Sequence, residues 1–454
     1  MGNPDKINQP NDPKEEKPQH RTSRLSGFYK LDVSERLDKL DEWLPLSNEE
    51  KWMLKKETLS LEKANMMIEN VIGIFGLPLG LAVNFRINGK DYVIPMAVEE
   101  TSIVAAAGNM AKLIRENGDL TASSKRAIME GQIQLFNVDR IETAVKKIEK
   151  AKERLLRVAN QQDRMLVRLG GGAKDLYCRK ISTESGPMLI VHLAVAVVDA
   201  MGANAVNTMV ETLGPIIAEI AQGELLCQII TNLCDKSLIQ ARFEIGVDCL
   251  AKGDFSGLQV AERIVKEYHF ADADPYRAAT HNKGVMNGID GIVIATGNDW
   301  RAVEAAAHAY AARTGRYRSL TKYRIEDNKL IGEIELPLAV GVVGGVTRLH
   351  PAVEILLKIL GKPSRRELAE IMAAAGLVQN FAAVRTLVTE GIQRGHMTLH
   401  ARNVAYFAGA IGEMAVHVAN QMEREGLIRF DRAKEILKNL LVHRQNENGD
   451  GEEA

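Results

Sequence analysis

Two basic side chains at a short spacing are the first candidates for chemistry in this chain of 454 residues. Arg277 follows Asp274-Pro275-Tyr276, and Lys283 comes six residues later, in Thr280-His281-Asn282-Lys283-Gly284. An arginine and a lysine beside proline and glycine turns could bind a carboxylate and polarise a carbonyl group. A solvated basic loop explains the pattern about equally well, because lysine side chains are usually exposed.

A turn of small residues, Asp199-Ala200-Met201-Gly202-Ala203-Asn204, is the second candidate. We expect it between a strand and a helix, where backbone N–H groups and the helix N-terminus favour a phosphate or a carbonyl oxygen. The turn is not G-x-G-x-x-G, and the sequence contains no such fingerprint, so an ordinary Rossmann domain is not indicated. Asp199 as a plain helix cap is the simpler explanation of this motif.

Asp299 is the third candidate, in Thr296-Gly297-Asn298-Asp299. We expect it to follow an apolar strand at 289–295 and to open a helix at 300–312, where capping alone would explain it. A glycine-rich loop, Gly341-Val342-Val343-Gly344-Gly345, would let the backbone approach a bulky ligand closely. Glycine clusters are also common in loops that bind nothing.

A pair of histidines, His396 and His400, has the i, i+4 spacing that can place two imidazoles on one zinc ion. Met397 stands where a metalloprotease helix would have glutamate, and no third ligand is evident. We therefore expect no metal. Either histidine alone could be an acid–base group or a packed core residue.

The elements that must hold these residues predict a multidomain α+β / α/β chain, because 454 residues exceed one usual core. Asn88-Gly89 predicts a hairpin of strands at 81–87 and 91–98. Strands and helices then alternate in a compact inserted unit at 127–232. We expect the following parts: tails at 1–24 and 444–454, a discontinuous large domain at 25–126 and 233–390, the inserted unit, and a helical segment at 391–443.

Composition limits the partners of the protein. A formal net charge of −1 provides no general attraction to nucleic acid or to an anionic membrane. The four cysteines form no C-x-x-C pair, which favours reduced thiols. The most continuous apolar run, 188–198, is too short to span a bilayer. We expect a cytoplasmic protein without a nucleic-acid or membrane partner.

Taken together and in this order, the motifs resemble those of the class II (bacterial-type) 3-hydroxy-3-methylglutaryl-coenzyme A (HMG-CoA) reductases over residues 25–430. Six ordered blocks are far more specific than any one of them. The blocks that carry the resemblance are Glu69-Asn70-Val71-Ile72-Gly73, Val98-Glu99-Glu100 with Ser102, Asp199–Asn204, Asp274–Arg277 with His281–Gly284, Thr296–Asp299, and Gly395-His396-Met397.

The resemblance implies roles for individual residues. Two sequence departures concern the substrate: Thr101 stands where proline is expected, and Tyr29-Lys30 stand where an arginine would touch coenzyme A. The implied catalytic residues are Glu100, Lys283, Asp299 and His396; the implied substrate contacts are Ser102 and Arg277 for the HMG carboxylate, Asn287, and Glu69 and Asn70 in a segment shared between the subunits of a homodimer.

The resemblance also implies a small, non-Rossmann, ferredoxin-like domain at 127–232 that binds the dinucleotide through Asp199, Met201, Gly202 and Asn204, and a mobile C-terminal flap. It matches Asp163 to the acidic residue that hydrogen-bonds the adenosine ribose. That carboxylate would repel a 2′-phosphate, so NADH is favoured, whereas Arg164 could pair with the phosphate of NADPH.

The implied reaction interconverts HMG-CoA with mevalonate and coenzyme A through a hemithioacetal and mevaldehyde, using two NAD(P)H. Lys283 would stabilise the oxyanion, Glu100 would donate a proton to the aldehyde, and His396 would protonate the departing thiolate. Three alternatives stay open at this point: a catalytically silent coenzyme A-binding regulatory dimer, a Schiff-base lyase that uses Lys283, and a zinc hydrolase that uses His396 and His400.

Overall fold

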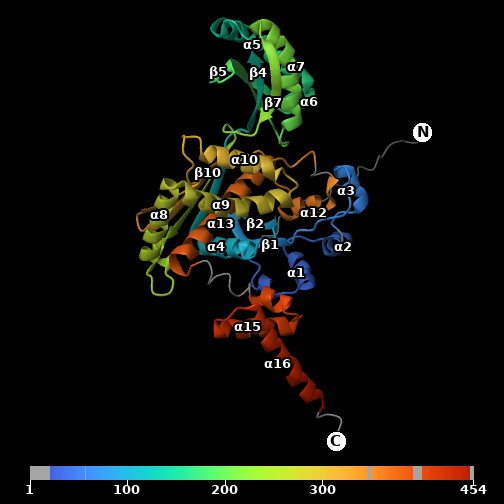
Figure 1. Ribbon diagram of the computed structural model, residues 1–454, viewed down its shortest axis with the longest axis vertical. Coiled ribbons are helices and arrows are strands. Elements are labelled where there is room, and N and C mark those ends of the chain that lie inside the picture. The colour runs from blue at the N-terminus through green and yellow to red at the C-terminus, as the bar shows by residue number, and fades with distance from the viewer. Residues whose placement is uncertain (1–20, 57, 346–348, 392–400, 450–454) are drawn as a thin grey trace, which may run out of the picture.

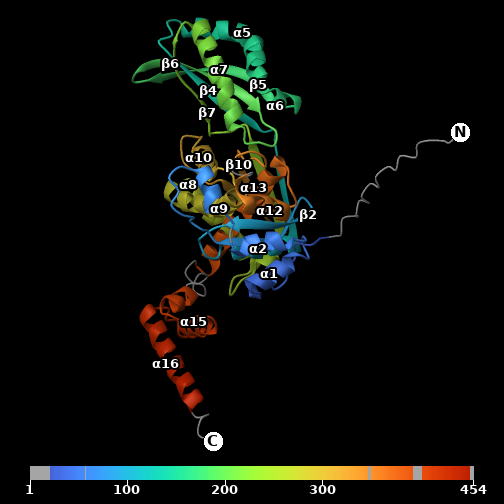
Figure 2. The same cartoon turned by 90° about the vertical axis from the view of Figure 1, so that its right-hand side faces the viewer.

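The computed structural model describes residues 21–56, 58–345, 349–391 and 401–449 (Figure 1). A small unit lies at one end of the long axis, a large body lies in the middle, and C-terminal helices lie at the other end (Figures 1 and 2). The large body and the small unit each have a hydrophobic core of their own.

The N-terminal segment begins to pack on the large body before residue 25, where the sequence analysis placed the end of the tail. Ser23, assigned to the tail, is fully buried, and its hydroxyl donates to the carbonyl of Phe85 at 2.8 Å. At the start of α1 the Asp32 carboxylate accepts from the N–H of Glu35, and the Glu35 carboxylate accepts from the N–H of Asp32. This is the capping-box arrangement. The elements of this segment are η1 (Phe28–Lys30), α1 (Val33–Leu40), α2 (Asn48–Lys56) and α3 (Leu61–Met67).

The expected hairpin is confirmed as β1 (Leu79–Ile87) and β2 (Lys90–Ala97). Asn88 and Gly89 both have positive φ, 52° and 78°, as a two-residue hairpin turn requires. The hairpin shares its core with a four-stranded antiparallel sheet of order β3-β8-β10-β9. The strands of that sheet are β3 (Gly118–Ser124), β8 (Leu238–Gly246), β9 (Thr321–Glu326) and β10 (Lys329–Pro337).

Helix α13 (Arg365–Thr389) runs through the middle of this core (Figure 1). Within the described residues it is the one helix long and apolar enough to cross a membrane, yet 72% of its most apolar 18-residue window is buried inside the protein. That burial is typical of a core helix. The helices around it are α4 (Ile103–Asn117), η2 (Val247–Leu250), α8 (Gly257–Ala273), α9 (Pro275–Ala295), α10 (Trp300–Ala311) and α12 (Pro351–Ile359).

Helix α9 corrects two expectations. The strand predicted at 289–295 and the loop suggested at 280–284 are both parts of this one helix. Asp274 caps it through the N–H groups of Tyr276 and Arg277, and Pro275 occupies the first turn, where its missing N–H is harmless. The C-terminal half of α9 is buried on most sides. The sequence there is a continuous apolar run without the 3.6-residue periodicity of an amphipathic helix. Sequence alone cannot distinguish such a run from a buried strand.

The small unit has the chain order β4-α5-β5-β6-α7-β7 and the strand order β5-β6-β4-β7, with every pair antiparallel. This is the βαββαβ arrangement. Ser237, where the chain returns to the large body, exchanges hydrogen bonds of 2.7 and 2.9 Å with the backbone of Ile128. The elements are β4 (Ile128–Phe136), α5 (Ile141–Gln162), α6 (Arg164–Arg168), β5 (Gly172–Thr183), β6 (Gly186–Ala196), α7 (Ala203–Ala221) and β7 (Glu224–Thr231).

The C-terminal helices form an apolar cluster of their own, which extends away from the large body (Figure 2). They comprise a helix at 401–407, α15 (Glu413–Glu425) and α16 (Phe430–Gly449). Because α16 reaches Gly449, most of the tail expected at 444–454 is helical. His396 and His400 lie outside the described residues, as does part of the glycine-rich joint at 391–395.

Candidate active site

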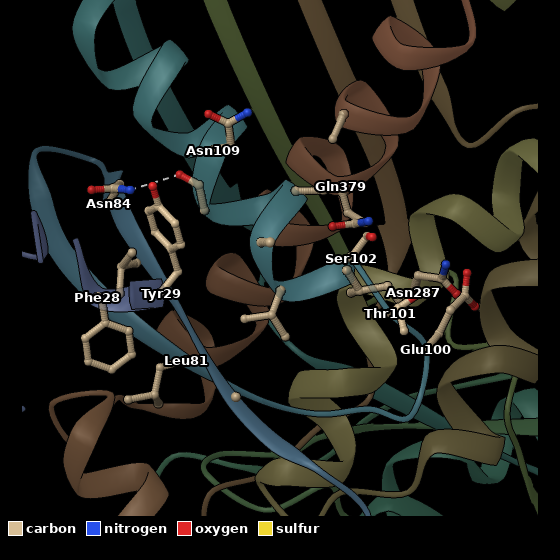
Figure 3. A pocket seen from close by; sticks show the side chains of 18 of the residues that line it. Phe28, Tyr29, Leu81, Asn84, Glu100, Thr101, Ser102, Asn109, Asn287 and Gln379 are labelled. Carbon is tan, nitrogen blue, oxygen red and sulfur yellow. Dashed lines mark hydrogen bonds between the residues drawn. The ribbon is translucent and has the colours of Figure 1, made fainter. Parts of the chain in front are cut away.

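A cavity of about 1760 Å³ lies between the N-terminal segment, β1 and the helices α4, α9 and α13 (Figure 3). Its wall includes Glu100, Ser102, Arg277, Lys283 and Asn287, which the sequence analysis singled out separately. The residues come from two regions almost two hundred positions apart. The fold therefore brings the acid, the hydroxyl, the amide and both cations of the prediction to one cavity.

The centre of this group is an ion pair between α9 and the turn that precedes α4. The Lys283 amine donates a hydrogen bond to Oε2 of Glu100. Their side chains are 57% and 39% exposed, so both groups remain accessible from the cavity. Ser102 opens α4 with a φ of 74°, a left-handed conformation that is uncommon for serine and frequent at functional sites.

Arg277 is held before any ligand arrives. Its Nε donates to Glu267 of α8, and both side chains are largely buried, at 13% and 19% exposure. A guanidinium has five N–H donors, so the remaining ones can still bind a carboxylate in a fork. Arg277, Lys283 and Asn287 all lie on α9, so one rigid helix provides three of the polar groups that line the cavity.

A buried polar network fixes α9 against α13 behind the cavity. The amide of Asn380 donates to the carbonyl of His281 at 3.0 Å and accepts from the hydroxyls of Thr321 and Tyr323 at 3.1 and 2.7 Å. His281 Nε2 lies 2.6 Å from the Thr321 oxygen. Burial lowers the pKa of His281 to about 3, so this histidine is a neutral positioning group, two residues before Lys283.

Asp299 lies elsewhere. Its carboxylate caps α10 by accepting from the N–H groups of Arg301 and Ala302 at 3.0 and 3.1 Å. It is not among the described residues that line the cavity of its own chain. Its neighbour Asn298 accepts a 2.7 Å bond from the backbone of Gly341, at the start of the glycine-rich loop. The capping explanation therefore describes its contacts within the chain.

The Asp199–Asn204 turn meets the large body at this same glycine-rich loop. The N–H of Val342 donates to the carbonyl of Asp199 at 2.9 Å, and the N–H of Arg365 donates to its carboxylate at 3.3 Å. Gly202 precedes α7 with a φ of 93°, which glycine adopts readily. Backbone N–H groups of such a turn and of a helix N-terminus are the donors that phosphate groups bind, so the chemistry of the residues present fits a dinucleotide.

Asp163 and Arg164 lie at the start of the short helix α6. The Asp163 carboxylate caps α6 by accepting from the N–H of Leu166 at 2.8 Å, and Arg164 is the first helical residue. One carboxylate oxygen of Asp163 is therefore used by the protein itself. The predicted ribose contact and the predicted phosphate contact lie side by side at the same helix end.

Glu69 and Asn70 belong to an exposed segment after α3 and do not line the cavity of their own chain. Asn70 has a φ of 57°. The apolar side chains of Ile72 and Phe75 in the same segment are almost fully exposed. Exposed apolar side chains clustered in this way mark interaction surfaces. In the described part of the chain, no group of three or more His, Cys, Asp or Glu residues is arranged to hold a metal ion.

Sequence reasoning missed Gln379, a polar residue of α13 that lines the cavity. A single amide in an apolar helix forms no motif. The only available signal was two adjacent amides, Gln379-Asn380, inside a run that is otherwise apolar.

Comparison with known proteins identifies the family. The family model described as hydroxymethylglutaryl-coenzyme A reductase matches residues 32–401. The 3-hydroxy-3-methylglutaryl-coenzyme A reductase of Archaeoglobus fulgidus is 51% identical over 420 residues, which cover 92% of this chain and 95% of that protein. The probable reductase of Borreliella burgdorferi is 35% identical over 388 residues, covering 84% and 88% of the two chains.

Solved structures agree. The reductase of Streptococcus pneumoniae superposes with a TM-score of 0.79 at 41% identity, covering 91% of this chain and 99% of that one. The class II reductase of the same organism, bound to NADPH in open conformations, gives a TM-score of 0.78 at 43% identity, covering 80% and 99%. Both comparisons thus indicate a family of oxidoreductases. The chain belongs to the hydroxymethylglutaryl-coenzyme A reductase family, in its class II form.

Proposed function

We propose that this protein interconverts HMG-CoA with mevalonate and free coenzyme A through two hydride transfers. The observation that carries the proposal is the Lys283–Glu100 ion pair on the wall of a large cavity that also contains Arg277 and Ser102. An amine paired with an acid can stabilise an oxyanion and then supply a proton. In this proposal Arg277 and Ser102 hold the HMG carboxylate, and Asn287 contacts the same group.

Lys283 acts at the carbonyl oxygen of the substrate in both reductions. A nicotinamide dinucleotide supplies the hydride when bound. The negative charge that develops on the oxygen is stabilised by the ammonium of Lys283, and Glu100 keeps that amine charged. In the second reduction the alkoxide formed from mevaldehyde needs a proton, which we assign to Glu100 after its carboxylate has taken up a proton from solvent. Asp299 is the second proposed acid.

His396 is proposed to protonate coenzyme A when the hemithioacetal collapses. The C–S bond breaks, its electron pair leaves with sulfur, and the imidazolium transfers its proton to the thiolate. Imidazolium (pKa about 6.5) is a stronger acid than a thiol (about 8.5), so the transfer is favourable and prevents the return of sulfur. We further propose that the C-terminal segment with this residue is a flap that opens for cofactor exchange between the reductions.

The role of His396 predicts a split between two assays. His396→Gln should lower the reduction of HMG-CoA by about 100-fold or more, because the thiolate then leaves without an acid. Reduction of free mevaldehyde, which has no thiolate to release, should fall far less. Equal losses in the two assays would contradict the assignment.

We propose a homodimer with a shared active site. Glu69, Asn70 and Asp299 lie outside the cavity of their own chain, so a second subunit must supply them if they act on the substrate. The exposed Ile72 and Phe75 beside Glu69 support an interface there. Mixing inactive Glu69→Ala and Lys283→Met proteins should restore part of the activity through mixed dimers. No recovery after subunit exchange would contradict a shared site.

The ferredoxin-like unit at 127–232 is the proposed dinucleotide-binding domain, and NADH is the proposed donor, because the Asp163 carboxylate opposes a 2′-phosphate. We also propose a cytoplasmic enzyme that needs no metal. Nicotinamide absorbance, followed after mixing the purified protein with HMG-CoA and each reduced cofactor, tests the activity directly. Two equivalents of cofactor should be oxidised per coenzyme A released. Absence of oxidation with both cofactors would overturn the proposed function.

A further inference from the structure

The buried helix α13 carries two neighbouring amides with opposite situations. Asn380, at 1% exposure, uses both ends of its amide in the network with His281, Thr321 and Tyr323. Gln379, at 6% exposure, has an Oε1 atom that is buried and finds no hydrogen-bond partner within the part of the chain that the structure describes. Buried polar groups are almost always paired in folded proteins, so this amide oxygen calls for a partner from outside the chain.

Close packing of α13 on α9 sets the place of Gln379. A Cβ atom added to Gly288 would lie 2.8 Å from Cβ of Gln379 and 2.8 Å from the carbonyl oxygen of Ala375. Only glycine at 288 lets the two helices approach this closely. The approach puts the Gln379 side chain on the wall of the cavity that Ser102, Asn287 and Glu100 also line (Figure 3). The unpaired amide therefore lies at the end of the cavity proposed to hold the HMG group.

The chemistry of that ligand selects the group that Gln379 can bind. The HMG carboxylate and the thioester carbonyl only accept hydrogen bonds, and Arg277, Ser102 and Lys283 offer donors for them. An amide oxygen needs a donor instead. The tertiary hydroxyl on carbon 3 is the one donor of the HMG group, and the reaction leaves it unchanged from HMG-CoA to mevalonate.

We propose that Gln379 is a specificity-determining residue that accepts a hydrogen bond from the 3-hydroxyl of the HMG group. The proposal rests on the proposed function, since it takes HMG-CoA as the ligand of this cavity. It makes the enzyme selective for 3-hydroxyacyl over 3-deoxyacyl thioesters. The penalty against the deoxy ligand arises because the amide oxygen stays buried and unpaired when the hydroxyl is missing.

Calorimetric binding of HMG-CoA and of 3-methylglutaryl-CoA, which lacks only the hydroxyl, tests the proposal without turnover. The wild-type protein should bind HMG-CoA roughly 10- to 100-fold more tightly. In Gln379→Met, a side chain of similar length without polar atoms, the two Kd values should converge, mainly through weaker binding of HMG-CoA. The KM for HMG-CoA should rise with it, while the KM for the dinucleotide should not change.

Asn380→Leu is the matched structural variant. It removes the neighbouring amide, so it should lower Tm and weaken both thioesters by the same factor. Equal affinity of the wild-type protein for the two thioesters overturns the proposal, and so does a preference that persists in Gln379→Met. Gln379→Asn, which withdraws the amide by one methylene, replaces the methionine variant if that protein does not fold. A protein that discriminates the hydroxyl but oxidises no cofactor would sink the proposed function and leave this inference standing.

Discussion

The substrate cavity and the small βαββαβ unit are held in the molecule in different ways. The helices that form the cavity wall, α4, α9 and α13, belong to one continuous core and are tied by buried groups such as Asn380. The small unit has a separate core, and the chain passes between the two parts at 125–127 and 232–237. Separate cores joined by short crossings allow one part to move as a body relative to the other.

This difference matches the demands of the proposed reaction. The thioester and its aldehyde product must stay in one position through two reductions, which a rigid wall favours. The hydride donor must be exchanged between them, which suits a unit that can shift. We call the contact of Asp199 and Met201 with Gly341 and Val342 the seam between the two parts. The N–H of Gly341 also donates to Asn298, the neighbour of Asp299.

The largest expected effect lies on the rigid side. Lys283→Met removes the ammonium that we assign to the oxyanion and should lower kcat about 100- to 1000-fold for both HMG-CoA and mevaldehyde. The exposed Lys322 of β9 provides the matched control, because Lys322→Met removes a charge from a residue that does not line the cavity. Stopped assays of both substrates measure the loss. An activity close to wild type for either substrate would contradict the central role of Lys283.

A smaller effect is expected at the cofactor end of the small unit. Asp163→Ser keeps a cap for α6 while it removes the carboxylate that opposes a 2′-phosphate. The ratio of kcat/KM for NADH over NADPH should fall roughly tenfold. The affinity for HMG-CoA should stay unchanged, because the substrate cavity is in the other part. A wild-type preference for NADPH would defeat the assignment at once.

The seam itself can be tested with one methyl group. An added Cβ at Gly341 would lie 2.6 Å from the backbone nitrogen of Met201, so Gly341→Ala should displace the turn proposed to bind the dinucleotide. We expect the KM for the cofactor to rise up to about tenfold, with little change for HMG-CoA. Gly246→Ala is the control, because its φ of −61° and open surroundings tolerate a methyl group. Parallel rises of both KM values would show that the two parts do not act separately.

The smallest effect concerns the rigidity of α9. Burial, together with a hydrogen bond to Glu304 and its charge, raises the pKa of Asp290 from 3.8 to about 8. The folded chain thus keeps a proton that the unfolded chain loses above pH 4. This group therefore lowers the free energy of unfolding as pH rises from 4 to 8. Above pH 8 both states have lost the proton, and the free energy does not change further through this group.

Asp290→Asn keeps a neutral hydrogen-bonding group between α9 and α10 and has no proton to lose. Its Tm relative to wild type should therefore increase between pH 5 and pH 8, by about 2 °C, and then level off. The hydrogen bond with His308 lowers the pKa of Glu304 more than burial raises it, so that carboxylate stays charged across the range. Thermal unfolding by circular dichroism measures the difference. A constant difference from pH 5 to pH 8 would contradict a protonated Asp290.

Local signals in the sequence were reliable where one residue type meets one backbone requirement. Asn88-Gly89 predicted the hairpin because few other pairs accept two positive φ values. The sequence signals failed where burial on most sides removed the helical periodicity, as at 289–295, which is helix and not strand. Strand β5 was missed because polar residues such as Lys174 and Asp175 interrupt its alternation, and β3 because it is short and largely polar.

The site divides in the same way. Motifs near Lys283 and Glu100 could be named from the sequence, but their ion pair depends on the packing of α4 against α9 and α13, which no local pattern encodes. Gln379 escaped notice because its importance lies in a missing partner and not in a spacing. Whether Asp299 and Glu69 reach a substrate depends on the second subunit that we propose, and no pattern within one chain describes such a partner.

Helix α13 has a further consequence, for the way the protein is made. A segment apolar enough to enter a bilayer is a hazard while it is exposed during synthesis. Its packing partners α4, β8, α8 and α9 all precede it in the chain. The elements that pack against α13 are therefore translated before α13 itself, which shortens the time for which this apolar segment has no partner to pack on.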